Sequence, residues 1–219
     1  MPSRSTEDYL KNIYHLQMEN RHVSTSSLAS ALKISPASVS EMISKLSANG
    51  HIINTPYHGF KLTKHGEKIA INLVRKHRLI EVFLKKHLNY PWDEVHTEAE
   101  KFEHVCSDTF IDKLDEYLGF PRYDPHGDPI PDKQGKLKIP NSRLLSNAEN
   151  GKNYFVSKVN DTSNDILKYI SKIGIKLKTK IHIKEKLRFD NSLLVKVGKN
   201  DFLLTSKIAD NISVEECQN

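Results

Sequence analysis

The sequence predicts a mainly α-helical protein with a β-rich carboxy-terminal domain. Apolar residues recur at helical spacing through most of residues 5–118, which favours a series of amphipathic helices. Over residues 152–216 apolar and polar residues alternate instead, as in short strands of a small barrel or sandwich, with one helix near 164–173. Five prolines and three glycines between residues 121 and 151 mark an extended linker. We therefore expect three domains, at 1–75, 76–140 and 141–219.

The charge of the chain is unevenly distributed. Residues 1–75 carry nine Lys and Arg against five Asp and Glu, and residues 76–140 carry ten against thirteen. A basic first third followed by an acidic middle suits a polyanion-binding module joined to a cation-binding one. The absence of a long apolar run and of a signal-peptide pattern predicts a cytoplasmic protein without a membrane partner. The two cysteines, Cys106 and Cys217, fit neither a disulfide framework nor a metal knuckle.

Three short helices and a hairpin are predicted at the amino terminus. The helices are expected at 5–19, 24–32 and 36–48, and the strands at 51–55 and 60–63. Ser24 and Ser35 are suited to cap the second and third helices, and Pro36 takes the first-turn position that proline favours. The short break between these helices has helix-turn-helix dimensions, and the hairpin, turning around Pro56, would be the wing.

The third helix is the candidate DNA-recognition element. Its exposed residues are small and hydroxylated, so they can approach phosphates and base edges closely. The alternative is a generic three-helix core with a hairpin. The residues expected near DNA are Ser35, Ala37, Ser38 and Ser40, with Lys33 and Lys45 on phosphates.

Three further helices are expected at 64–89, 93–106 and 107–118. The first has more apolar surface than a small domain needs, which favours a partner subunit. His77 and Glu81 stand four residues apart on it and are candidate metal ligands, although Glu81 is equally suited to bridge to Lys85.

A group of acidic residues and histidines follows in the second of these helices. Glu100, Glu103 and His104 share a helical face, with His96 two turns before His104. Two carboxylates and an imidazole at one spot would bind a divalent metal. The alternative for this segment alone is an ordinary charged, solvated helix surface.

The chain resembles the DtxR/MntR family of metal-dependent transcriptional repressors over residues 5–131. The carboxy-terminal third matches in layout the SH3-like domain, a small β-barrel, of the longer members. The matching stretches are 6–10 with Ile13 and Tyr14, 35–50, 75–81, 95–105 and the linker segment 127–131.

This resemblance implies two metal sites per subunit. A primary site would use Asp8, Glu100, Glu103 and His104, and a second would use His77, Glu81, His96 and Asp161. Asp165 is the less favoured alternative to Asp161. Iron-sensing members have methionine and cysteine where Asp8 and Glu100 stand, so the oxygen donors favour Mn2+ over Fe2+ or another divalent transition metal. The short manganese regulators have a second carboxylate at the position of Lys11, so two separated sites are expected in place of their binuclear site.

The function implied is that of a manganese-dependent repressor of metal-uptake genes, a homodimer that binds double-stranded operator DNA with Mn2+ as corepressor. An iron-dependent regulator of the same architecture and a metal-independent winged-helix protein are the nearer alternatives. A metalloenzyme using the same cluster is disfavoured, because the chain lacks an H-E-x-x-H motif and an evident nucleophile–base pair.

Overall fold

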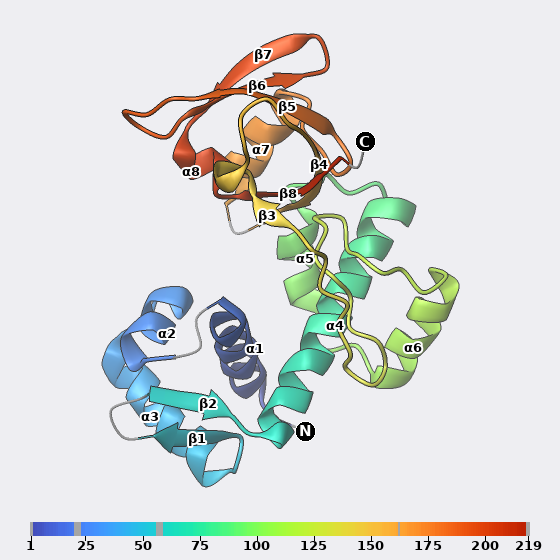
Figure 1. Ribbon diagram of the computed structural model, residues 1–219. Coiled ribbons are helices and arrows are strands. Elements are labelled where there is room, and N and C mark those ends of the chain that lie inside the picture. Colours follow the sequence, from blue (N-terminus) through green and yellow to red (C-terminus); the bar gives the residue numbers. More distant parts are fainter. Residues whose placement is uncertain (1, 20–22, 56–58, 162, 218–219) are drawn as a thin grey trace. The chain divides into compact units, whose positions relative to one another are not determined.

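The computed structural model describes residues 2–19, 23–55, 59–161 and 163–217. These residues form a helical amino-terminal region and a carboxy-terminal antiparallel sheet (Figure 1). They group into two compact units, the first of residues 1–77, 101–112 and 131–136 and the second of residues 78–100, 113–130 and 137–219. Within the described ranges, no helix is both long enough and apolar enough to cross a membrane.

The first unit begins with three helices and a two-stranded hairpin. The elements are α1 (Arg4–Glu19), α2 (Thr25–Leu32), α3 (Pro36–Ala48), β1 (Ile52–Thr55) and β2 (Gly59–Leu62). Ser24 and Ser27 form the reciprocal capping box of α2, and Ser35 caps α3 with Pro36 in its first turn, as predicted. The predicted turn around Pro56 lies outside the described residues.

Buried aliphatic side chains hold these elements together. The core includes Leu10, Ile13, Leu28, Val39, Leu46 and Ile52. The hairpin is fixed to the segment before α2, because the backbone N–H of Phe60 donates to the carbonyl of Val23 at 3.0 Å. Gly59 is required at that contact, since a Cβ there would stand 2.2 Å from the Val23 oxygen and its φ is +74°.

The long helix α4 (Lys64–His87) follows the hairpin and continues from the first unit into the second. After it come α5 (Val95–Phe102) and α6 (Asp108–Tyr117). The helix predicted over 93–106 is shorter than expected, because the backbone leaves helical geometry after Phe102. Glu103 and His104 therefore lie in a turn and not on a helical face.

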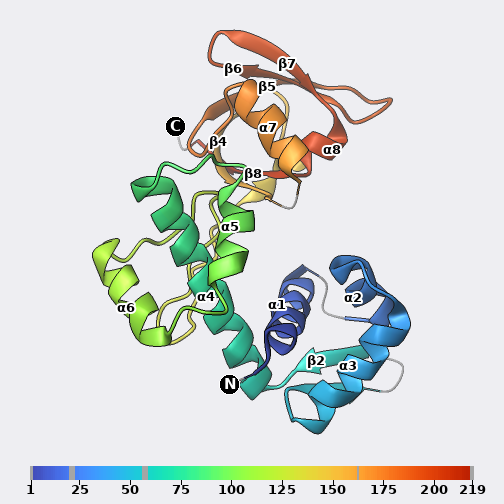
Figure 2. The same cartoon turned by 180° about the vertical axis from the view of Figure 1, so that it is seen from behind.

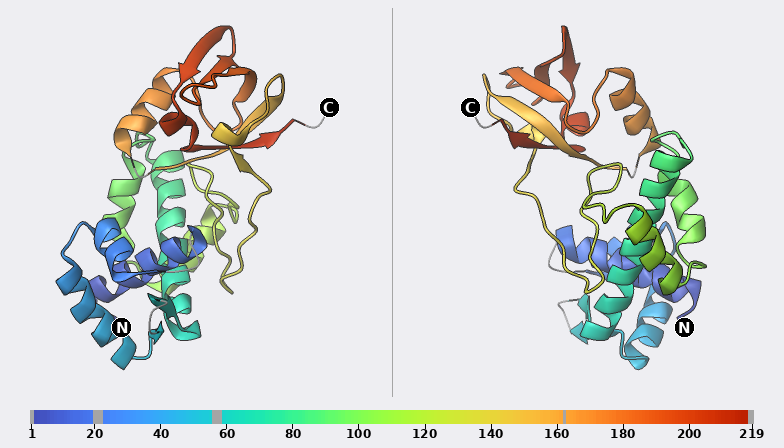
Figure 3. Two further views of the ribbon diagram at one scale, coloured as in Figure 1. Left: turned by 60° about the vertical axis from the view of Figure 1, so that its left-hand side comes forward. Right: turned by 90° about the vertical axis from the view of Figure 1, so that its right-hand side faces the viewer.

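The second unit contains a six-stranded sheet in the order β3-β8-β4-β5-β6-β7, antiparallel throughout. Its strands are β3 (Arg143–Leu144), β4 (Asn153–Val159), β5 (Lys180–Lys186), β6 (Leu193–Val197), β7 (Asn200–Leu204) and β8 (Ile212–Glu216). The helix α7 (Asn164–Lys172) lies against the sheet (Figure 2) and buries Leu167 and Ile170 in its core. Between α6 and β3 the chain runs without helices or longer strands (Figure 3), in agreement with the predicted linker.

Candidate metal centres

The first cluster consists of Asp8, Glu103 and His104, all within the first unit. Each offers one ligand atom, and these atoms lie within 4.8 Å of one another. The Nε2 atom of His104 is 3.0 Å from Oδ1 of Asp8 and 3.4 Å from Oε1 of Glu103. Asp8 comes from α1, whereas Glu103 and His104 come from the turn after α5, so the cluster joins two distant segments of the chain.

Burial differs across the first cluster in a way that suits an ion exchanging with solvent. The side chains of Glu103 and His104 are 1% and 6% exposed, but that of Asp8 is 40% exposed. Two carboxylates and one imidazole provide only part of a hexacoordinate shell, and water reaching the Asp8 side can complete it.

The second ring nitrogen of His104 contacts another carboxylate. Its Nδ1 atom is 2.7 Å from Oε2 of Glu7. Glu7 therefore contacts the opposite side of the imidazole ring from Asp8. A carboxylate on one ring nitrogen fixes the tautomer that turns the other nitrogen toward a metal, as in carboxylate–histidine–metal triads. Glu7 is therefore a candidate orienting residue.

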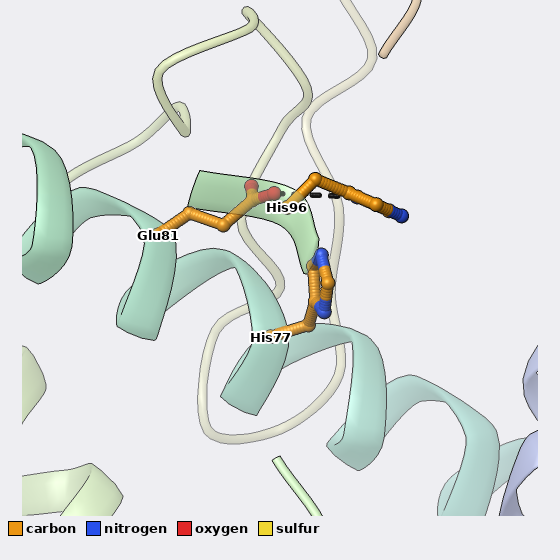
Figure 4. A group of neighbouring side chains, drawn as sticks. All are labelled: His77, Glu81 and His96. Carbon is orange, nitrogen blue, oxygen red and sulfur yellow. Dashed lines mark ion pairs between the residues drawn. The ribbon is translucent and has the colours of Figure 1, made fainter. Parts of the chain in front are cut away.

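The second cluster consists of Glu81, His96, His126 and Asp161, all within the second unit. The Nδ1 atom of His96 is 2.9 Å from Oδ2 of Asp161 and 3.4 Å from Oε1 of Glu81. Figure 4 shows Glu81 reaching from α4 toward His96, with His77 on the preceding turn of the same helix.

His126 faces the same two carboxylates, and its Nδ1 atom makes no hydrogen bond within the part of the chain that the structure describes. Its Nδ1 atom is 3.9 Å from Oε2 of Glu81 and 3.8 Å from Oδ2 of Asp161, and both His126 and Glu81 are fully buried. Buried polar atoms that face one another beyond hydrogen-bond distance require an explanation, and a cation between them supplies one.

The charges in this cluster shift the pKa of its members strongly. Burial alone would lower the pKa of His96, but hydrogen bonds with Asp161, Glu100 and Glu81 raise it to about 12. Burial also opposes the charge on His126, yet the carboxylates of Glu81 and Asp161 raise its pKa to about 9. Without a metal, both imidazoles therefore hold a proton in place of an ion.

A tight turn positions His126. Oδ1 of Asp124 accepts hydrogen bonds from the backbone N–H groups of His126, Gly127 and Asp128, at 2.8 to 2.9 Å. The Nε2–H of His126 donates to the carbonyl of Trp92 at 2.9 Å, which directs Nδ1 into the cluster. Gly127 has φ +96°, and a Cβ there would stand 2.1 Å from the Ser157 oxygen, so the turn rests directly on β4.

Asp124 itself is buried beside the cluster. An oxygen of Asp124 lies within 4.8 Å of ligand atoms on Glu81 and His126. Burial and the charges of Glu81 and Asp128 raise its pKa to about 8. A nearby cation would stabilise the charged form of this buried carboxyl, so Asp124 is a further candidate ligand.

The predicted ligands are thus divided between the two clusters and their surroundings. Glu100 lies with its Oε1 3.5 Å from Nε2 of His96, and Nδ1 of His77 lies 2.5 Å from Oε2 of Glu103. Asp161 contacts His96, while Asp165 is exposed in the first turn of α7. The predicted DNA-contacting residues are all exposed, at the start of α3, along it or just before it: Lys33, Ser35, Ala37, Ser38, Ser40 and Lys45.

Sequence reasoning missed Glu7, Asp124 and His126. The last two lie in the segment Asp124-Pro-His-Gly-Asp128, for which the sequence predicts only a linker. An aspartate followed by Pro and Gly is the composition of a capped turn, and a histidine within it was the available signal.

Three family models match the chain. The iron dependent repressor N-terminal DNA binding domain covers residues 1–60, and the iron dependent repressor metal binding and dimerisation domain covers residues 63–132. The FeoA domain covers residues 143–216. Together they span the helical region and the sheet.

Curated relatives agree with these matches. The chain is 36% identical over 127 residues to the iron-dependent repressor IdeR of Mycobacterium tuberculosis, which covers 58% of this chain and 55% of IdeR. It therefore spans only about half the length of that relative. It is 34% identical over 114 residues to the HTH-type transcriptional regulator MntR of Lysinibacillus sphaericus, covering 52% of this chain and 81% of that protein.

A solved structure extends the similarity to nearly the whole chain. A manganese-dependent transcriptional repressor in complex with manganese is 36% identical and superposes with a TM-score of 0.90, covering 97% of this chain and 100% of the other. The chain therefore belongs to the iron-dependent repressor family, the DtxR/MntR family of metal-dependent transcriptional repressors, which are DNA-binding proteins and not enzymes.

Proposed function

We propose that this protein is a manganese-dependent transcriptional repressor that binds operator DNA as a homodimer, with Mn2+ as corepressor at two sites per subunit. The observation that carries this proposal is the first cluster, in which Asp8 on α1 meets Glu103 and His104 after α5. All of its donors are oxygen or nitrogen atoms, which suit Mn2+, and none of the described residues in the group offers a thiolate or thioether for a softer ion. The metal-bound relative described above is itself a manganese-dependent repressor.

The two sites use different residues. We assign the first to Asp8, Glu103 and His104, completed by Glu100, as the family resemblance implies. The second is assigned to Glu81, His96, His126 and Asp161. His77 is a further candidate for the second site because the family resemblance implies it. Asp124 is another, because it is buried beside Glu81 and His126.

The DNA-binding surface is assigned to α3 and the hairpin, which we interpret as a winged helix-turn-helix. Ser35, Ala37, Ser38 and Ser40 would approach the bases, with Lys33 and Lys45 on phosphates. We interpret the sheet of the second unit as the SH3-like domain. Operator DNA as the partner implies that the protein acts in the cytoplasm.

The corepressor effect follows from linkage between metal and DNA. An ion shared by Asp8, Glu103 and His104 would fix α1 against the turn after α5 by charge attraction. If that arrangement is the one that binds DNA, the ion strengthens DNA binding and DNA strengthens ion binding equally. If the repressed genes encode metal uptake, a rise in Mn2+ inside the cell would reduce further Mn2+ uptake.

The test is DNA binding measured by fluorescence anisotropy, using DNA selected from the genome in Mn2+. We expect at least tenfold tighter binding in Mn2+ than in chelator, and loss of this difference in Asp8→Asn. Asp161→Asn should reduce the effect of Mn2+ on DNA affinity by removing a ligand of the second cluster. Asp165 is an exposed aspartate nearby in the sequence, and Asp165→Asn should behave as wild type. Equal affinity in Mn2+ and in chelator would overturn the corepressor role.

Iron dependence is the second candidate, favoured by the similarity to IdeR. It differs only in the ion that activates DNA binding. Wild type and Glu100→Cys would be compared in Fe2+ and Mn2+ without oxygen. Activation of wild type by Mn2+, with Glu100→Cys shifted toward Fe2+, supports manganese. Activation of wild type by Fe2+ alone supports the iron-dependent alternative.

A further inference from the structure

Lys11 is a buried lysine that the proposed function leaves unused. It lies on α1, and its side chain is only 10% exposed. Its Nζ atom is 2.8 Å from both carboxylate oxygens of Glu103 and 3.3 Å from Nδ1 of His77. Burying an ammonium is unfavourable unless it is paired and hydrogen-bonded, and both partners here are buried as well.

Glu103 separates two adjoining groups of charge. On one side, its Oε1 faces Nε2 of His104 at 3.4 Å, as part of the first cluster. On the other side, its Oε2 lies 2.5 Å from Nδ1 of His77, next to the Lys11 ammonium. Burial would raise the pKa of Glu103, but the hydrogen bond with His77 and the charge of Lys11 together lower it.

The partners of Lys11 are the donor types that a divalent ion would take. A carboxylate and an imidazole nitrogen at this separation are suitable ligands for a second ion beside the first cluster. The ammonium already contacts both, so it occupies that position and neutralises the carboxylate. A divalent ion brought there would meet a positive charge within contact distance and would have to displace it.

We propose that the Lys11 ammonium is a resident cation of this centre, which fills the side between Glu103 and His77 and limits the centre to one divalent ion. The proposal rests on the proposed function, since it concerns how many ions the same centre takes. Lys11 also ties α1 to α4 and to the turn after α5 without any metal, because its partners come from those two segments. The centre is therefore partly assembled before an ion arrives.

The experiment replaces the cation by a carboxylate. Lys11→Glu places an acidic side chain about one helical turn after Asp8, facing Glu103 and His77. At saturating Mn2+, native mass spectrometry should count one more ion per subunit than in wild type. Electron paramagnetic resonance should show two magnetically coupled ions. Lys207→Glu, a charge reversal at an exposed lysine of the second unit, should gain neither.

Two further arms keep the proposal falsifiable. A folded Lys11→Glu protein with the wild-type ion count overturns it. Should Lys11→Glu not fold, the ions beside the wild-type Lys11 can be counted in the double variant Glu81→Gln/His96→Ala, which removes the two ligands that the second cluster and His77 would share. One ion per subunit is then expected, and two coupled ions would overturn the proposal. Wild-type protein that takes up no Mn2+ at all would instead refute the proposed function.

Discussion

Nδ1 of His104 lies 2.7 Å from Oε2 of Glu7, while Nε2 of the same ring lies 3.0 Å from Oδ1 of Asp8. Two neighbouring acidic residues on α1 thus hold opposite nitrogens of one imidazole. Only one of them can share an ion with that ring, and the other must act by orienting it. We expect Asp8 to be the ligand and Glu7 the orienting residue.

Removing the Glu7 carboxylate should therefore weaken Mn2+ at the first cluster without abolishing it. Loss of such an orienting partner typically costs about 10- to 100-fold in metal affinity. Glu7→Ala should show the full loss and Glu7→Gln a smaller one, because the amide oxygen can still accept from Nδ1–H. Competition with a fluorescent chelator measures this, with Glu67→Gln, an exposed glutamate of α4, as control. Unchanged affinity in Glu7→Ala would contradict the assigned role.

Metal uptake at the second cluster should release protons. The pKa values of about 12 for His96 and about 9 for His126 lie above the ordinary 6.5, so both rings are protonated at neutral pH without a metal. A ligating imidazole must be neutral, so Mn2+ affinity should rise with pH through pH 9, where His126 loses its proton, and should continue to rise above it because His96 is still protonated there. Calorimetric titration in buffers of different ionisation enthalpy would count the protons. Heats that do not depend on the buffer would refute this prediction.

The same shifts have the opposite consequence for the metal-free fold. A raised histidine pKa adds stability that is complete below pH 6.5 and is lost as pH rises through the folded value. The contribution of His126 should therefore disappear as the pH passes about 9. Thermal unfolding in chelator would be measured for wild type and for His126→Gln at several pH values. The difference between their unfolding temperatures should become smaller as the pH passes about 9.

Asp124→Asn should have opposite effects on stability and on metal binding. The pKa of Asp124 is raised from 3.8 to about 8, chiefly by burial, so the unfolded chain loses this proton first and stability falls between those pH values. Asparagine avoids that loss and keeps an oxygen for the three backbone N–H groups. We expect the metal-free variant to unfold at a higher temperature at pH 8, and to bind Mn2+ less tightly at the second cluster. Unchanged metal affinity would show that Asp124 serves only the turn.

Lys33 stands in the turn between α2 and α3 with φ +56°, a conformation that glycine adopts without strain. Lys33→Gly should therefore stabilise the fold by about 1 kcal/mol. It should also weaken DNA binding and reduce its salt dependence, since the residue is expected on a phosphate. Denaturant unfolding and anisotropy at several salt concentrations measure the two effects. Unaltered DNA affinity would remove Lys33 from the interface.

The amino-terminal helices were predictable because their ends are determined locally. Ser24 with Ser27, and Ser35 with Pro36, carry the cap in the sequence itself, and the structure places both caps as expected. The end of α5 at Phe102 has no such signal, since no glycine or proline follows there. Glu103 leaves the helix at a point where its partners, Lys11 and His77, are distant in sequence.

The candidate site was predictable only where ligands share a helix or a family motif. Glu81 and His96 could be named in this way, and Asp161 by resemblance. His126 could not, because its approach to Asp161 depends on a turn resting on β4 through Gly127. Such a contact follows from packing between segments far apart in the sequence.

Trp92 is the only tryptophan of the chain, and its ring stacks on that of His126 with centroids 5.4 Å apart. All indole emission from this protein therefore arises beside one cluster. A paramagnetic ion, or a change in the imidazole charge at that distance, alters the emission of an indole. The protein thus carries its own optical probe, which reports filling of the second cluster in unlabelled material.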